Sequence, residues 1–147
     1  EYSIKGEFVA NGYNKNTIRH EEGVISMARG DYSAYGYVEE GYNSAGSQFF
    51  IMTKNTSTLN GLYAAFGKVI EGMDVIHNIE NVEVVTRDSS EEDADKPVNP
   101  PVIKSIRVET YGIDYKVSRG SKSGDYGIDY GIPETIDPFN LSQLFNQ

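Results

Sequence analysis

The chain has 147 residues and carries 22 acidic against 13 basic side chains, which gives a formal net charge of −9. Because such an acidic surface repels phosphate backbones, nucleic acid is not an expected partner. The sequence has no cysteine, which excludes disulfides, thiol catalysis and thiolate metal sites. No stretch approaches the roughly 20 apolar residues of a membrane-spanning helix, so we expect a soluble protein, either cytoplasmic or secreted.

Three short apolar segments predict buried strands. Residues 23–28 (GVISMA) follow a charged stretch, and residues 48–52 (QFFIM) are aromatic and β-branched. Residues 64–70 (AAFGKVI) give a third strand pattern, which Gly67 interrupts, and a glycine inside a strand often marks a bulge. With 15 glycines and 11 tyrosines in the whole chain, these segments indicate a mainly β fold rich in turns.

Residues 71–81 predict a short helix after the third strand. Met73, Ile76 and Ile79 recur at helical spacing and form an apolar stripe that faces the core. His77 is then expected on the exposed side of this helix.

The segments after the helix are mostly polar. Residues 82–85 fit a strand, and residues 86–97 (TRDSSEEDADKP) fit a solvated loop whose acidic residues lack the spacing of a calcium-binding EF-hand. Residues 103–108 alternate in polarity and predict a final strand with one buried face. Residues 113–147, which include the glycine- and serine-rich stretch of residues 116–125, are expected to form a C-terminal tail on a domain of residues 1–112.

The usual catalytic motifs are missing from the sequence. There is no GxSxG, no glycine-rich phosphate loop and no HExxH, so a hydrolase or a metalloenzyme has little support. The two histidines, His20 and His77, lie far apart with no ligand-like spacing, and no metal site is expected.

Residues 43–52 (NSAGSQFFIM) pass directly from a small, flexible loop into an aromatic strand. In a strand, Gln48, Phe50 and Met52 lie on the same face, so an amide and a large aromatic ring point the same way. Two interpretations stay open. The segment is either a loop entering a core strand, with Gln48 bonded to backbone groups, or an apolar pocket floored by Phe50 beside an amide that binds a ligand carbonyl.

Three strings carry a resemblance to a known family: GVISMAR at residues 23–29, NSAGSQFFIMT at 43–53 and LNGLYAAFGKVIEGMDVI at 59–76. They strongly resemble the cyclophilin family of peptidyl-prolyl isomerases, and YSIKGEF at residues 2–8 is similar to bacterial members. The resemblance covers the chain from residue 2 to about residue 110. It implies a cyclophilin-like antiparallel β-barrel with a short helix, here incomplete, that catalyses rotation about Xaa-Pro bonds without a cofactor.

The resemblance also implies roles for individual residues. Gln48 matches the glutamine that hydrogen-bonds the substrate backbone, and Phe50 matches the phenylalanine that forms the proline pocket. We expect these two residues to be catalytic.

Substrate binding is expected at four further positions, by the same resemblance: Ala28, Arg29, Leu59 and Tyr63. Thr58 stands where some members have a tryptophan linked to cyclosporin binding, so at most weak cyclosporin binding is expected.

The chain departs from the family in two places. Residues 30–42 (GDYSAYGYVEEGY) form a longer loop than in simple bacterial members, which is either a tolerated insertion or a tyrosine-rich wall that shapes peptide preference. The family's catalytic arginine lies in an upstream strand that this sequence does not contain. We therefore expect the N-terminal strands to be supplied by a separate or omitted segment, or the tail to complete the barrel.

The resemblance favours an isomerase that acts in protein folding on proline-containing peptides or unfolded proteins. The main alternative is a catalytically incomplete module that binds such peptides without turnover. A third is an interaction protein whose tail recruits a partner. The Xaa-Pro bonds before Pro133 and Pro138 also leave room for self-inhibition by the tail.

Overall fold

The computed structural model describes residues 3–88 and 93–113. Contacts divide these residues into two units, one that runs to Val69 and one that starts at Ile70, and each is described by itself. The predicted tail of residues 113–147 lies outside the described residues except for Ile113, so the domain boundary expected at residue 112 stays a prediction.

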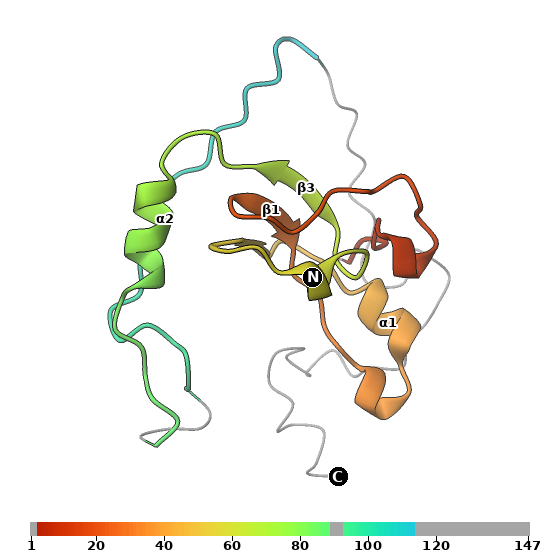
Figure 1. Cartoon of the computed structure of the whole chain (residues 1–147), viewed down its shortest axis with the longest axis horizontal. Helices are drawn as coiled ribbons and strands as arrows, with labels where there is room; N and C mark the ends of the chain where they lie inside the picture. The colour runs from red at the N-terminus through yellow and green to blue at the C-terminus, as the bar shows by residue number, and fades with distance from the viewer. Residues whose placement is uncertain (1–2, 89–92, 114–147) are drawn as a thin grey trace. The chain divides into compact units, whose positions relative to one another are not determined.

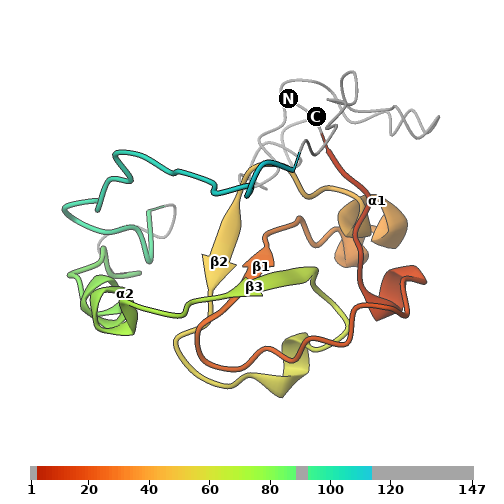
Figure 2. The same ribbon diagram turned by 90° about the horizontal axis from the view of Figure 1, so that it is seen from above.

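The first unit is built on a three-stranded antiparallel sheet in the order β2-β1-β3 (Figures 1 and 2). The central strand β1 spans Val24–Met27, and its neighbours are β2, Phe49–Ile51, and β3, Ala65–Lys68. All three predicted strands are confirmed, each shorter at its ends than the apolar run that predicted it. The expected mainly β fold with an incomplete barrel is confirmed as well.

The pairing of β1 with β3 contains an irregularity close to the predicted position. Ile25 pairs with Gly67, but the next residue, Ser26, pairs with Ala65. Phe66 is therefore an extra residue in β3, the arrangement of a β-bulge. The bulge turns the Phe66 ring outward, where 57% of the residue is exposed.

A small apolar core lies on one face of this sheet. Val24, Met52 and Ala65 are buried together, and Phe50 and Leu59 pack against them half-buried. The β1 side chains alternate in burial, so Val24 and Ser26 face this core.

A buried histidine supplies the polar partner that the core requires. His20 is 2% exposed, and its Nε2 lies 3.1 Å from the hydroxyl of the fully buried Ser26. The backbone N–H of His20 donates to Asn60 Oδ1 at 2.8 Å, and the ring Nδ1 lies 3.4 Å from the same oxygen. Burial lowers the pKa of His20, and the Asn60 hydrogen bond opposes this only in part. The ring is therefore neutral at neutral pH.

Four short helices complete the first unit: η1, Val9–Asn11; η2, Ser33–Tyr35; α1, Val38–Tyr42; and η3, Ser57–Leu59. The loop of residues 30–42 is thus folded into η2 and α1.

The loop of residues 30–42 is closed at its base by a serine just beyond it. The Ser44 hydroxyl accepts from the Gly30 N–H at 2.7 Å and donates to the Gly41 carbonyl at 2.8 Å. The two ends of the loop are therefore held together by one side chain.

The second unit contains the helix α2, Met73–Glu80, which confirms the predicted helix. His77 lies on its surface as expected, with Nδ1 at 3.2 Å from Glu80 Oε2 and 40% of its side chain exposed. The strand expected at residues 82–85 is wrong, because only an isolated bridge between Val84 and Pro97 forms there.

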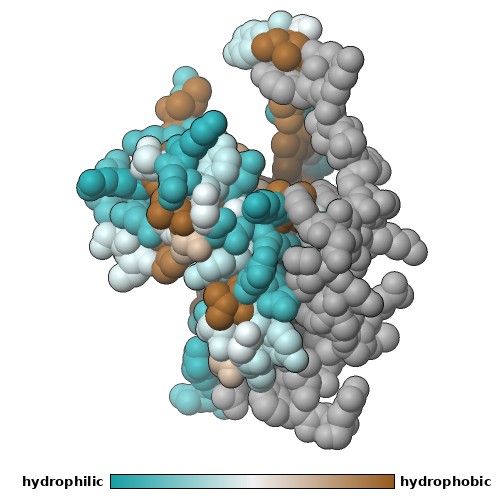
Figure 3. Space-filling view, turned by 90° about the vertical axis from the view of Figure 1, so that its right-hand side faces the viewer, coloured by the Kyte–Doolittle hydropathy of each residue, from teal (hydrophilic) through white to brown (hydrophobic). Residues whose placement is uncertain are grey.

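The predicted final strand at residues 103–108 is also wrong. The structure assigns no regular element to this segment. A strand requires a neighbour for its N–H and C=O groups, and alternating polarity does not supply one. The apolar residues of this segment, Ile103, Ile106 and Val108, are 66% to 79% exposed, and the preceding Val102 is exposed as well. On the face of the molecule shown in Figure 3, apolar side chains form separate patches among hydrophilic ones.

Across residues 3–88 and 93–113, no helix is both long and apolar enough to cross a membrane.

The burial of His20 predicts a pH-dependent stability. A folded-state pKa below the unfolded value means that the unfolded chain takes up a proton first as the pH falls. The free energy of unfolding should therefore decrease below about pH 6.5, by about 1.4 kcal/mol for each unit by which the pKa is lowered, and level off below the folded-state pKa. Denaturant unfolding between pH 5 and 8 measures this slope.

The two histidines provide a matched comparison for this experiment. His20→Gln should abolish the decrease between pH 7 and the folded-state pKa, whereas His77→Gln, at an exposed position, should retain it. A His20→Gln protein that shows the unaltered slope would mean that another group is responsible.

The core position of Met52 predicts a large effect of truncation. Met52 is 7% exposed and packs with Val24 and Ala65, so Met52→Ala should lower the free energy of unfolding by about 2–5 kcal/mol. Met73→Ala, at a half-buried position in α2, serves as the control and should cost less. Equal losses in urea denaturation would contradict the assignment of the core.

Candidate functional site

The candidate site is organised by one row of residues across the sheet. Ser26 in the central strand β1 pairs with Phe50 of β2 on one side and with Ala65 of β3 on the other. Directly paired residues project to the same face, so the Phe50 ring lies on the face that Ser26 and His20 occupy. Because an aromatic ring offers no strong hydrogen bond, the buried Ser26 hydroxyl and His20 ring beside it need each other as partners, and they do bond to each other.

Three rings form what we call the aromatic cluster: His20, Phe50 and Tyr63. The rings of His20 and Phe50 are stacked, with centroids 6.1 Å apart and an interplanar angle of 16°. Tyr63 meets Phe50 edge-on at 5.5 Å and 89°, and meets His20 at 6.3 Å and 75°. These are preferred geometries for aromatic pairs. Phe50 and Tyr63 are half-buried, so part of each ring is accessible to an apolar ligand.

An amide lies beside the aromatic cluster on the same strand. The Gln48 carbonyl accepts from the Ala28 N–H at 3.0 Å, which extends the β1–β2 pairing by one residue. Strand alternation then places the side chains of Gln48 and Phe50 on the same face. The Gln48 side chain is exposed and makes no hydrogen bond with any described residue. The interpretation in which backbone groups satisfy this amide therefore finds no support.

The Arg29 side chain packs on the Tyr63 ring. Its Nε donates to the Leu62 carbonyl at 3.0 Å and its Nη1 to the Gly30 carbonyl at 2.8 Å. These bonds place the guanidinium carbon over the Tyr63 ring, 4.5 Å from the centroid. This is the geometry of a cation–π contact.

The structure brings the sequence-predicted site residues into one region through pairwise contacts. Ala28 pairs with Gln48, Phe50 meets Tyr63, and Arg29 covers Tyr63. Leu59 packs on the same core as Phe50.

Sequence reasoning missed two residues that support the site, the buried His20 and the exposed Asn60 that it contacts. One signal was available: Ser26 stands at an inward position of the predicted strand, and a buried hydroxyl requires a partner. The pattern does not say which residue supplies it, because the partner lies in a separate segment.

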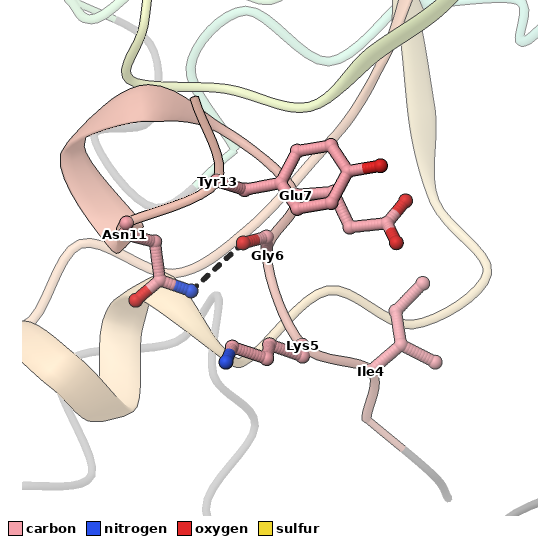
Figure 4. Close-up of a pocket in the computed structure, with 7 residues that line it drawn as sticks. Ile4, Lys5, Gly6, Glu7, Asn11 and Tyr13 are labelled. Atoms are coloured by element: carbon pink, nitrogen blue, oxygen red, sulfur yellow. Dashed lines mark hydrogen bonds between the residues drawn. The ribbon is translucent and has the colours of Figure 1, made fainter. Parts of the chain in front are cut away.

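A separate pocket of about 420 Å³ lies along the N-terminal segment (Figure 4) and contains none of the six predicted site residues. Asn11 Nδ2 donates to the Gly6 carbonyl at 2.8 Å beside it. It is lined by Ile4, Lys5, Gly6, Glu7, Asn11, Gly12 and Tyr13. Because the lining carries one basic and one acidic side chain, its charge favours neither an anion nor a cation.

The chemistry of the candidate site is that of neutral recognition. The described residues contain no group of three or more potential metal-ligating His, Cys, Asp or Glu side chains. The aromatic cluster consists of a neutral histidine and two partly accessible rings, and the neighbouring hydrogen-bond donor is the Gln48 amide. Apolar rings beside one polar group are the usual makeup of a small-molecule or peptide binding site.

The comparisons with known proteins point to one family. The family model for cyclophilin type peptidyl-prolyl cis-trans isomerase matches residues 2–108. The chain is 37% identical over 101 residues to peptidyl-prolyl cis-trans isomerase D of Saccharomyces cerevisiae, which covers 67% of this chain and 37% of that protein. It is 41% identical over 76 residues to the protein of the same name from Mycosarcoma maydis, covering 50% of this chain and 19% of the relative.

A third relative is peptidyl-prolyl cis-trans isomerase-like 2 of Rhizopus delemar, 37% identical over 78 residues, with 52% of this chain and 13% of the relative covered. The chain thus covers at most 37% of the length of any of these three relatives. The family match, however, extends over well more than half of the 147 residues. The chain belongs to the family of cyclophilin-type peptidyl-prolyl cis-trans isomerases.

Proposed function

We propose that the protein is a peptidyl-prolyl cis-trans isomerase that accelerates rotation about Xaa-Pro bonds in protein folding. The observation that carries the proposal is the pair formed by the exposed amide of Gln48, which makes no hydrogen bond with a described residue, and the half-buried ring of Phe50 on the same strand face. Substrates would be proline-containing peptides or unfolded proteins.

The reaction demands little beyond binding and orientation. Rotation about a peptide C–N bond faces a barrier of roughly 18–20 kcal/mol because amide resonance is lost in the twisted state. Uncatalysed Xaa-Pro exchange takes roughly tens to hundreds of seconds. An enzyme accelerates it by binding the twisted state more tightly than either planar state. No covalent bond is made, so the proposal requires no cofactor.

In this proposal the aromatic cluster and Leu59 hold the prolyl ring, while the Gln48 amide donates to a substrate carbonyl. Fixing both sides of the rotating bond would favour the twisted geometry.

The residues directly after β1, Ala28 and Arg29, would hold the substrate backbone. The Ala28 N–H already donates to Gln48, whereas the Ala28 carbonyl and the Arg29 N–H make no hydrogen bond with a described residue. Either group could pair with an extended peptide, but one peptide would use only one of them, because the C=O and N–H of a trans peptide unit point in opposite directions.

A peptide-binding module without turnover is the second candidate, and one observation favours it. The family resemblance implies an arginine that donates to the prolyl nitrogen. In this chain Arg29, which contacts the aromatic cluster, directs Nε and Nη1 to backbone carbonyls instead. The two candidates differ in whether an arginine of the intact protein reaches the prolyl nitrogen.

Exchange spectroscopy on a short Ala-Pro peptide tests the proposal in the intact protein. The protein should accelerate cis/trans exchange, and Gln48→Ala should reduce the catalysed rate about tenfold, the effect of one lost hydrogen bond. Gln48→Glu should lose activity as well, because at neutral pH a carboxylate of the same size cannot donate. Asn14→Ala, which removes an exposed amide outside the site, is the control.

The same measurement separates the two candidate functions. Peptide line broadening that shows binding without acceleration would support the binding module. If the peptide shows no binding and no acceleration, both candidate functions are excluded.

Cyclosporin binding gives a further prediction for the rim of the site. Thr58 lies exposed in η3, next to Leu59, where the family resemblance implies that a tryptophan promotes binding. Calorimetry should show weak cyclosporin binding by the intact protein and tighter binding by Thr58→Trp, because a large ring there adds buried apolar area. Equal affinities would count against this assignment of Thr58.

A further inference from the structure

Arg29 lies among three aromatic rings that come from separate segments of the first unit. The guanidinium carbon is 4.5 Å from the ring centroid of Tyr63, 5.0 Å from that of Tyr42 and 5.6 Å from that of Phe8. Tyr42 and Phe8 also meet each other edge-on at 5.1 Å. A half-buried cation surrounded by ring faces is attracted to each of them, more strongly where water is excluded.

The guanidinium is fixed in this position by its own hydrogen bonds. Nε and Nη1 donate to two backbone carbonyls, those of Leu62 and Gly30. A planar fork with directed N–H groups can make both bonds and stack on a ring at the same time, which a lysine ammonium cannot do. The Leu62 bond also joins Arg29 to the residue directly before Tyr63.

These contacts leave Tyr63 restrained on two sides. One face of its ring lies against Arg29, and the ring meets Phe50 edge-on at 5.5 Å. A tyrosine on an exposed loop would otherwise sample several rotamers, and each would change the space beside Phe50.

The other rings connect Arg29 to the loop of residues 30–42. Tyr42 is the last residue of α1 and of that loop, and its ring centroid lies 5.0 Å from the Arg29 guanidinium carbon. Within the described part of the chain the rings of Tyr42 and Phe50 are not in contact, so an effect of Tyr42 on the pocket would pass through Arg29.

We propose that Arg29 is a positioning residue that sets Tyr63 against Phe50 and couples Tyr42, at the end of the 30–42 loop, to the proposed proline pocket. The inference rests on the proposed function for its consequence in catalysis, but the restraint on Tyr63 is a property of the structure alone. The loop then influences peptide affinity through one side chain and not through direct contact with the proline.

A double-mutant cycle in the intact protein tests this coupling. Arg29→Met keeps the length of the side chain but removes its charge and its fork, and should raise KM for an Ala-Pro peptide about three- to tenfold with a smaller change in kcat. Tyr42→Leu should raise KM less in the parent and not at all in the Arg29→Met background. Arg29→Lys should recover part of the loss, since it keeps the charge and loses the fork. Arg107→Met, an exposed arginine in the second unit, should leave KM unchanged.

A spectroscopic readout keeps the test independent of turnover. The NMR signals of the Tyr63 ring, labelled with 13C, should shift and broaden in Arg29→Met and shift in Tyr42→Leu, with circular dichroism confirming that each variant is folded. Unmoved Tyr63 signals, or additive effects of the two substitutions on KM, would overturn the proposal. If the parent protein does not catalyse exchange, the proposed function fails, whereas the Tyr63 signals still decide the role of Arg29.

Discussion

The buried contact between Ser26 and His20 is the constraint on which the site depends. Ser26 lies at the centre of the sheet with no exposed surface, and a hydroxyl there costs about 1–3 kcal/mol if it has no partner. His20 supplies the partner at 3.1 Å and its backbone N–H binds Asn60, which fixes the segment before β1 against the segment before β3. The imidazole that satisfies the serine also stacks on Phe50, so one buried polar requirement sets the position of the aromatic cluster.

The charge distribution of the chain and the chemistry of the site are largely independent. The chain carries a net charge of −9, yet the aromatic cluster contains a neutral histidine and the adjoining donor is an uncharged amide. Rotation about an amide bond moves no proton and breaks no covalent bond. The proposed reaction therefore requires only groups that bind and orient the peptide, such as the rings, the Gln48 amide and the backbone directly after β1. Arg29 brings a formal charge into contact with the cluster, and its fork is engaged by backbone carbonyls.

The local patterns of the sequence predicted the parts of the fold that local patterns determine. The apolar runs gave β1, β2 and β3, and strand alternation alone placed Gln48 and Phe50 on one face. The same alternation failed at residues 103–108, because a pattern describes one strand and says nothing about the neighbour it must pair with. His20 and Asn60 were missed for a similar reason, since both act through contacts between segments that are distant in sequence.

The role of Arg29 could not be predicted from its position either. The resemblance to cyclophilins pointed to Arg29 only as a substrate-binding position, whereas the structure shows a side chain held by two carbonyls and stacked on Tyr63. That arrangement depends on Tyr42 and Phe8 arriving from other segments, and tertiary packing of this kind leaves no periodic signal in the sequence.

The clamp formed by Ser44 has a consequence for how this protein can evolve. Because one hydroxyl joins Gly30 and Gly41, the two ends of the 30–42 loop stay together whatever lies between them. The entropy of closing a loop rises only slowly with its length, by about 0.6 kcal/mol for each doubling. Insertions and deletions between Gly30 and Gly41 would therefore leave Ala28 and Gln48 paired. Related proteins could differ in the length of this loop without disturbing that pairing.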